Sequence, residues 1–191
     1  MPIQAPELRE LLTLQPCASY TSVEHKGLYG FSRGGSYHIS AVLPAVSSAI
    51  GYPISTQLHP TPRIDQEALG IPDVKSIIVV LVDGLGFWNI VLRIGHVPYL
   101  RFLLQHEENQ RPISTCFPST TVSAMGTFGT GTCPGLTGMV GYTQLNTQTH
   151  TISQMIQFRD AIAPEELQQE PTIFEQLQKQ GVRITAVGLP K

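Results

Sequence analysis

Apolar residues along this chain recur in two spacings, which together predict alternating strands and helices. Residues Ser76 to Val82 read SIIVVLV, an unbroken apolar run that predicts a strand buried on both faces of a parallel sheet. Helical spacing over Phe87 to His106, interrupted by a glycine and a proline, predicts one kinked helix or two short ones. An amphipathic helix over Thr172 to Gln180 and a strand over Val182 to Val187 are predicted next.

Other segments fill in the organisation of the chain. Helical spacing predicts short helices over Pro6 to Leu14 and Ile39 to Ile50, and a helix of small residues over Thr120 to Thr130. Prolines make most of Pro53 to Pro72 an expected extended surface linker. The pattern predicts an α/β fold with a mainly parallel sheet flanked by helices. We divide the chain into an N-terminal lead-in, residues 1–75, and the first half of an α/β domain, residues 76–191.

Composition and charge narrow the possible function classes. The chain carries 12 Lys and Arg against 14 Asp and Glu, so it offers no broad basic face for nucleic acid or anionic lipid. Its longest apolar run is of strand length, well short of the roughly 20 residues that span a bilayer. Three cysteines without zinc or disulfide spacing favour a reducing compartment. We therefore expect a cytoplasmic protein with no nucleic-acid and no membrane partner.

Asp83 directly follows the first predicted strand, beside two glycines that let a ligand approach closely. A carboxylate at the end of a buried strand suits a metal or phosphate site. The alternative is that Asp83 caps the following helix, since aspartate is a favoured N-cap. A dinucleotide-binding loop is a weaker reading, because Asn89 stands where the third glycine of G-x-G-x-x-G would fall.

A second candidate lies where Ser119, Thr120 and Thr121 lead into the helix of small residues. The free N–H groups of a helix amino terminus stabilise an oxyanion or a phosphate. A hydroxyl there becomes a nucleophile toward phosphorus when a divalent metal, held by a carboxylate such as Asp83, stabilises its alkoxide. The alternative is that these hydroxyls are simple helix caps and that the nearby glycines only allow close helix packing.

Together the two motifs resemble the first half of type I phosphodiesterase/nucleotide pyrophosphatase proteins, a branch of the alkaline phosphatase superfamily. In that family a buried strand ends in V-D-G, which supplies a metal-ligating Asp, and a nucleophilic Thr or Ser lies ten residues before the glycine of a T-G pair. Here the strand gives Asp83, and counting ten back from Gly131 reaches Thr121 rather than Thr120. The family's T-G-x-x-P-x-x-H-G frame fits Thr130 to Gly138.

The resemblance implies an alkaline-phosphatase-like fold and metal-dependent hydrolysis of a small-molecule phosphate ester. Thr121 would form a covalent phosphothreonine intermediate, and two divalent ions, expected to be zinc, would be held in part by Asp83 and Thr121. The backbone N–H of Val122 would stabilise the oxyanion. Tyr142 occupies the position of the Asn that binds the phosphoryl oxygen in nucleotide pyrophosphatases, which makes it a weaker candidate for that role and puts nucleotide specificity in doubt.

The ligand set is incomplete by this comparison, because most of the family's metal-binding Asp and His residues come from a half that would follow Lys191. Thr137 stands in place of the family's His. The alternative function is therefore a catalytically inactive, truncated remnant or a binding module of the same fold. An unfinished sheet would also expose an edge near Val182 to Val187, through which the chain could self-associate. We expect all the histidines to lie on surfaces or loops: His25, His38, His59, His96, His106 and His150.

Overall fold

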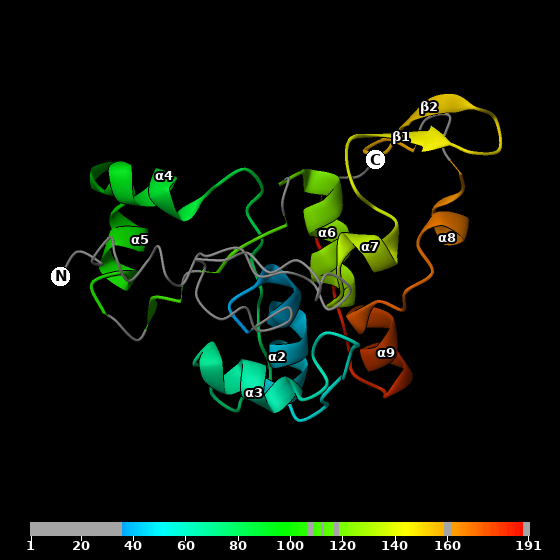
Figure 1. Cartoon of the computed structure of the whole chain (residues 1–191). Helices are drawn as coiled ribbons and strands as arrows, with labels where there is room; N and C mark the ends of the chain where they lie inside the picture. The colour runs from blue at the N-terminus through cyan, green and yellow to red at the C-terminus, as the bar shows by residue number, and fades with distance from the viewer. Residues whose placement is uncertain (1–35, 107–108, 112, 117–118, 159–161, 189–191) are drawn as a thin grey trace, which may run out of the picture.

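The computed structural model describes residues 36–106, 109–111, 113–116, 119–158 and 162–188, in which helices predominate (Figure 1). The predicted helix over Pro6 to Leu14 lies outside them. In chain order the described elements are η2 (Ile39–Ala41), α2 (Val42–Ala49), α3 (Pro62–Ala68), α4 (Phe87–Leu92), η3 (Ile94–His96), α5 (Pro98–Leu103), α6 (Thr121–Thr130), α7 (Pro134–Thr137), β1 (Thr143–Asn146), β2 (Thr151–Gln154), α8 (Pro164–Leu167) and α9 (Ile173–Lys179).

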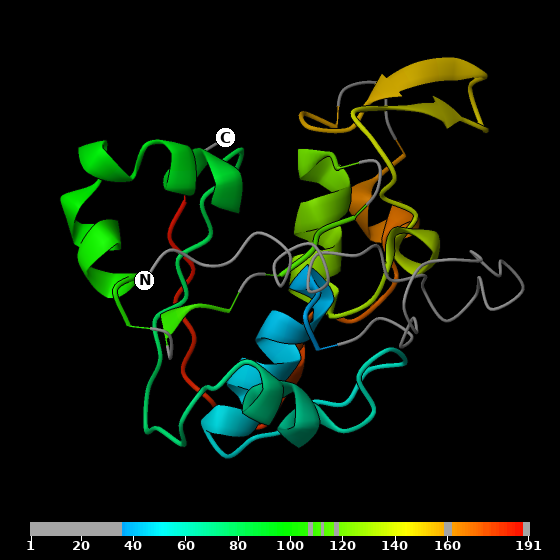
Figure 2. The ribbon, with the colours of Figure 1, turned by 60° about the vertical axis from the view of Figure 1, so that its left-hand side comes forward.

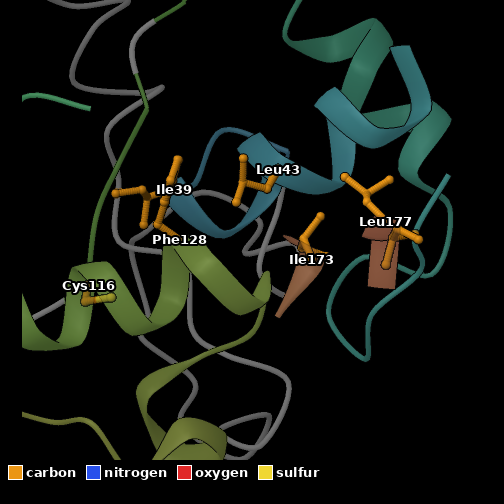
Figure 3. Packing of buried hydrophobic residues seen from close by; sticks show 7 residues of the cluster. Ile39, Leu43, Cys116, Phe128, Ile173 and Leu177 are labelled. Carbon is orange, nitrogen blue, oxygen red and sulfur yellow. The ribbon is translucent and has the colours of Figure 1, made fainter. Parts of the chain in front are cut away.

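The hydrophobic core forms where α2, α6 and α9 meet. Leu43 of α2 packs with Phe128 of α6 and with Ile173 and Leu177 of α9 (Figure 3). Pro44 lies in the first turn of α2, where backbone N–H groups have no carbonyl partner within the helix, so the missing N–H of proline costs no hydrogen bond. Each large apolar side chain buried in this way contributes roughly 1.5–3 kcal/mol. The helices predicted over Ile39 to Ile50, Thr120 to Thr130 and Thr172 to Gln180 are confirmed.

Caps fix both ends of α6, the longest helix described. At its start, Oγ1 of Thr120 accepts a hydrogen bond from the N–H of Ser123 at 3.2 Å. At its end, Gly131 adopts the left-handed conformation with φ of 65°. A Cβ at Gly131 would lie 2.8 Å from Cγ of Pro44. This glycine therefore ends the helix and also lets it approach α2 closely.

The linker predicted over Pro53 to Pro72 is wrong in part, because it contains α3. Pro62 is the first residue of that helix, a position where proline is well tolerated. Asp65 and Gln66 are buried, and Gln66 accepts a hydrogen bond from Ser48 of α2 at 2.7 Å. Helix α3 packs along α2 in both views (Figures 1 and 2). The prolines of this segment thus mark the start of a helix as well as extended chain.

Of the two alternatives predicted over Phe87 to His106, one kinked helix or two short ones, the second is confirmed: α4 and α5 are separate, with η3 between them. Gly95 lies within η3, and Pro98 begins α5, so the two expected interruptions divide the helices. In Figures 1 and 2, α4 and α5 stand to one side of the group formed by α2, α6 and α9.

The structure is a small α/β fold, but it does not show the mainly parallel sheet that the sequence predicts. In the described residues the only named strands are β1 and β2, which pair as an antiparallel hairpin. Residues 76–82 and 182–187 carry no assigned strand. The prediction that 76–82 is buried on both faces is wrong here, since Ile78 is 90% and Val80 77% exposed. The run is β-prone, yet a strand forms only where a second backbone lies alongside to pair with it.

Candidate active site

Three side chains from distant parts of the chain meet at the start of α6. The Oγ1 of Thr121 donates to Oδ2 of Asp83 over 3.0 Å, and the hydroxyl oxygen of Tyr142 lies 2.8 Å from the same Oγ1. Because a threonine hydroxyl has one proton and gives it to Asp83, the Tyr142 hydroxyl must be the donor in the second contact. The Thr121 oxygen is therefore held between a carboxylate acceptor and a phenol donor.

Two neighbouring threonines have different roles at this helix end. The Thr120 side chain is the N-cap and is occupied by the backbone N–H of Ser123, whereas Thr121 is the first residue of the helix and faces Asp83. The simple-cap alternative therefore applies to Thr120 and not to Thr121. Ser119 is exposed.

Val122 is the second residue of α6, and its side chain is buried. Its backbone N–H belongs to the first turn, where N–H groups have no carbonyl partner within the helix. The aligned peptide dipoles add partial positive charge at this end. A phosphate oxygen placed beside Thr121 would therefore meet a favourable field from α6.

Asp83 is placed by the turn that follows the extended segment 76–82. Gly84 has φ of 69°, a left-handed conformation that favours glycine. The N-cap of α4 is Gly86, whose N–H donates to Oδ1 of Asn89 at 3.0 Å. Asp83 is thus not the cap of the following helix, and its carboxylate is directed to Thr121 instead.

The site opens to solvent. Asp83 and Tyr142 are exposed, and Thr121 is half-buried. The Thr121 hydroxyl thus lies beside two exposed side chains.

The described residues offer only a partial metal centre. Asp83 and Thr121 provide two oxygen donors of a suitable kind, but a zinc ion takes about four ligands. Within the part of the chain that the structure describes, no group of three or more His, Cys, Asp or Glu side chains could hold a metal ion. These residues therefore do not by themselves fit a two-zinc centre, and the chemistry assigned below is that of the protein side chains.

Thr137, which stands in place of the family's His, is fully buried in α7, and its Oγ1 accepts a hydrogen bond from the N–H of Met139 at 3.2 Å. A Cβ at Gly126 would lie 3.0 Å from Sδ of Met139 and 3.4 Å from Oγ1 of Thr137. Both residues serve packing of α6 against α7. For Gly126, the close-packing alternative is the correct one.

The cysteines described are not competing nucleophiles. Cys116 and Cys133 are buried free thiols, and Cys17 lies outside the described residues. Burial raises the pKa of the Cys116 thiol, whose Sγ lies 3.1 Å from Oγ1 of Thr127. The reactive thiolate is therefore disfavoured at that position.

Sequence reasoning missed two features of the chain. Tyr142 was expected near a phosphoryl oxygen, but its contact with the Thr121 hydroxyl joins residues with no shared local pattern. His59 lies in a loop, as expected, but its burial against Asp65 was not foreseen. That pair spans a loop and the start of a helix, and no periodic spacing reveals it.

None of the helices in the described part of the chain combines the length and apolar character needed to cross a bilayer.

Comparison with known proteins yields a family but no individual relative. No curated protein and no solved structure matches the chain. The family model for type I phosphodiesterase/nucleotide pyrophosphatase matches residues 77–191, more than half of the sequence. On that match, and with Asp83 and Thr121 inside it, the chain belongs to the type I phosphodiesterase/nucleotide pyrophosphatase family.

Proposed function

We propose that the chain acts in the hydrolysis of small-molecule phosphate esters, with Thr121 as the nucleophile. Family membership supports activity of the phosphodiesterase and pyrophosphatase type in general. The observation that carries the finer proposal is the position of the Thr121 hydroxyl, which lies at the start of α6 between the Asp83 carboxylate and the Tyr142 hydroxyl. A nucleophile, a proton acceptor and a hydrogen-bond donor for phosphate thus occupy one exposed site.

The reaction follows from these contacts. Phosphate oxygens of the ester would accept hydrogen bonds from the Val122 N–H and from the Tyr142 hydroxyl, which turns from Thr121 to the substrate and so frees the lone pair needed for attack. Oγ1 of Thr121 then bonds to phosphorus, its proton passes to Asp83, and the bond to the leaving alcohol breaks. The leaving oxygen lies in line with Oγ1 on the far side of phosphorus, away from Asp83, so it takes its proton from a water molecule. The hydroxide so formed attacks phosphorus, and Asp83 returns its proton to Oγ1 of Thr121 as the phosphothreonine bond breaks, which restores the hydroxyl and releases the second product.

The family is metal-dependent in general, and we extend that dependence to this chain. We propose that the chain binds two divalent ions, that both are zinc, and that Asp83 and Thr121 are among their ligands. The remaining ligands would have to come from residues other than those described. Bound metal would supply Lewis-acid stabilisation of charge on phosphorus oxygens.

Paired substitutions at the two threonines test the nucleophile. Thr121→Ala removes the attacking oxygen, so turnover of bis(4-nitrophenyl) phosphate with added zinc should fall by at least about 100-fold. Thr121→Ser keeps a hydroxyl and should retain measurable turnover. Thr120→Ala removes only the helix cap and should retain most of it. Turnover of Thr121→Ala equal to the unsubstituted chain would reject this role for Thr121.

The alternative is a catalytically inactive, truncated remnant or a binding module of the same fold. It is supported by the lack, among the described residues, of any group of three or more His, Cys, Asp or Glu side chains that could hold a metal ion. Titration with zinc separates the two proposals. Tight stoichiometric binding by the purified chain argues for a metal-dependent hydrolase, whereas no saturable binding argues for the alternative.

We also propose that residues 76–82 and 182–187 are strands of a mainly parallel, alkaline-phosphatase-like sheet, and that the domain boundary lies at residues 75 and 76. Both segments are rich in the β-branched residues that favour strands. Exposure of Val187 supports association of two copies through this edge. Sedimentation of the purified chain at rising concentration tests that association.

We further propose a cytoplasmic location, which the odd cysteine count supports.

A further inference from the structure

An apolar surface adjoins the Thr121 hydroxyl on the exposed side of α6. Met125 is the only exposed residue of this helix, which the structure describes in full, and 48% of it is accessible. It lies four residues after Thr121 and therefore on the same face of the helix. Side chains of an α-helix lean toward its N-terminus, so Met125 covers the turn that begins with Thr121. The thioether thus lies beside the candidate nucleophile.

The segment between α7 and β1 extends this surface. One end of the segment contacts α6 at Gly126, where an added Cβ would lie 3.0 Å from Sδ of Met139. Further along, the hydroxyl of Tyr142 lies 2.8 Å from Oγ1 of Thr121. The segment therefore runs beside the first turns of α6 (Figure 1). Val140 lies between these two contacts in the chain and is 51% exposed, so it adds a second apolar side chain to the surface.

This part of the chain has no formally charged side chain. The sequence from Pro112 to Phe158, which includes α6, α7 and the hairpin of β1 and β2, contains no Lys, Arg, Asp or Glu. Of the three side chains that meet at the start of α6, only Asp83 is a charged type. Its carboxylate repels each negative charge of a substrate, whereas the partial positive charge at the helix start favours an anion. A phosphodiester, with one negative charge, suits this balance better than a pyrophosphate.

We propose that Met125 and Val140 bind an aryl or alkyl group of the substrate, and that the preferred substrate is a phosphodiester with an apolar ester group. The inference rests on the function proposed above and names its substrate class. Four residues of a helix rise about 6 Å, a span that an aryl ester bridges when its phosphate lies beside Thr121. The flexible thioether of methionine also makes favourable contacts with aromatic rings.

The size of the surface favours a small ligand over a second copy of the chain. A stable protein interface takes roughly 800 Å² from each partner, far more than a few half-exposed side chains provide. Met125, Val140 and the ring of Tyr142 are each about half exposed. They also surround a hydroxyl and a carboxylate, which a small phosphate ester can contact at the same time.

Carbon-13 NMR of the methionine methyl groups tests the proposal by binding alone. Diphenyl phosphate, dimethyl phosphate and inorganic pyrophosphate would each be titrated into the full chain without added metal. The Met125 signal should shift with diphenyl phosphate, while the signal of the buried Met155 stays constant. The affinity for diphenyl phosphate should exceed that for dimethyl phosphate, which has the same charge, by at least about 10-fold. Pyrophosphate should bind more weakly than diphenyl phosphate.

A matched pair of variants assigns the effect to α6. Met125→Gln keeps the length of the side chain but removes its apolar end, so the affinity for diphenyl phosphate should fall about fivefold. Ile152→Gln makes a comparable change at another exposed position, in β2, and should leave the affinity unchanged. No measurable binding of diphenyl phosphate, equal affinity for the two diesters, or unchanged affinity in Met125→Gln would overturn the proposal.

Two further measurements separate this proposal from the others. In Thr121→Ala the preference for diphenyl phosphate should persist, because the apolar surface does not include the hydroxyl. A failure of Thr121 as nucleophile would therefore leave the binding result intact, whereas loss of the preference in Thr121→Ala would contradict the assignment to Met125 and Val140. Sedimentation compares Met125→Gln with the unsubstituted chain. Weaker self-association with unchanged affinity for diphenyl phosphate would assign the surface to a second copy and overturn the proposal.

Discussion

The α2 helix and the segment 76–82 are both strongly apolar, yet their surroundings are opposite. Leu43 of α2 is 2% exposed, whereas Ile78 and Val80 lie largely in solvent. A helix satisfies its backbone hydrogen bonds internally, so its apolar stripe needs only a surface to pack against. An extended segment needs a neighbouring backbone as well. Hydrophobic pattern therefore determines the helical core more completely than it determines the sheet.

The candidate active site joins these two regions. Thr121 begins a helix that is packed into the core, and Asp83 follows the exposed segment. The hydroxyl is thus held by core packing, while the carboxylate depends on a turn with few buried contacts. We expect disturbances of the core and of the segment 76–82 to have different consequences, and the predictions below rest on that difference.

The largest effect is expected from truncating the core. Leu43→Ala removes buried contacts with α6 and α9, and it should lower the free energy of unfolding by about 2–5 kcal/mol. Val80→Ala, a matched apolar truncation in the exposed segment, should change it by less than about 0.5 kcal/mol. Urea unfolding of both variants measures the difference. Equal losses would mean that the segment 76–82 is packed as tightly as the core.

A slightly smaller effect is expected from pH. The pKa of His38 is about 4 in the folded chain and about 6.5 when unfolded, so between these values the unfolded state binds the extra proton. Stability should therefore fall as pH drops from about 6.5 toward 4, by roughly 3 kcal/mol at most. His38→Gln should flatten this part of the urea-midpoint profile, and His96→Gln at an exposed position should not. An unchanged slope in His38→Gln would contradict the assignment.

Gly131→Ala should destabilise the junction of α6 and α2 by roughly 1–3 kcal/mol. The alanine would be strained at positive φ, and its Cβ would meet Pro44. Gly181, which also has positive φ but no atom within 4 Å of an added Cβ, provides the control. Gly181→Ala should cost less because only the backbone strain applies. Thermal unfolding compares the two variants, and an equal loss would show that the contact with Pro44 is unimportant.

The smallest effect is expected at the cap of α6. Thr120→Ala leaves the Ser123 N–H without its acceptor and should cost about 1 kcal/mol. Thr120→Ser keeps the hydroxyl and should restore most of the stability. Urea unfolding measures both variants. A loss in Thr120→Ser as large as in Thr120→Ala would show that the methyl group, and not the cap, matters.

The sequence predicts some parts of this molecule well for identifiable reasons. Asp83 and Thr121 could be selected because short local motifs and a family resemblance mark them, and the structure brings the two together. Tyr142 could not be paired with Thr121 in advance, since that contact depends on how the hairpin region folds back. The α3 helix could not be predicted because proline is common both in loops and at the first position of a helix. The burial of His59 depends on tertiary packing, which no local spacing encodes.

The most direct test of Thr121 as nucleophile is to identify the phosphorylated residue. The chain would be incubated with bis(4-nitrophenyl) phosphate and zinc, quenched in acid, digested and sequenced by mass spectrometry. We predict a phosphoryl adduct on Thr121, absent from the Thr121→Ala variant. An adduct on Thr120 or Ser119 instead, or turnover without any adduct, would contradict the account.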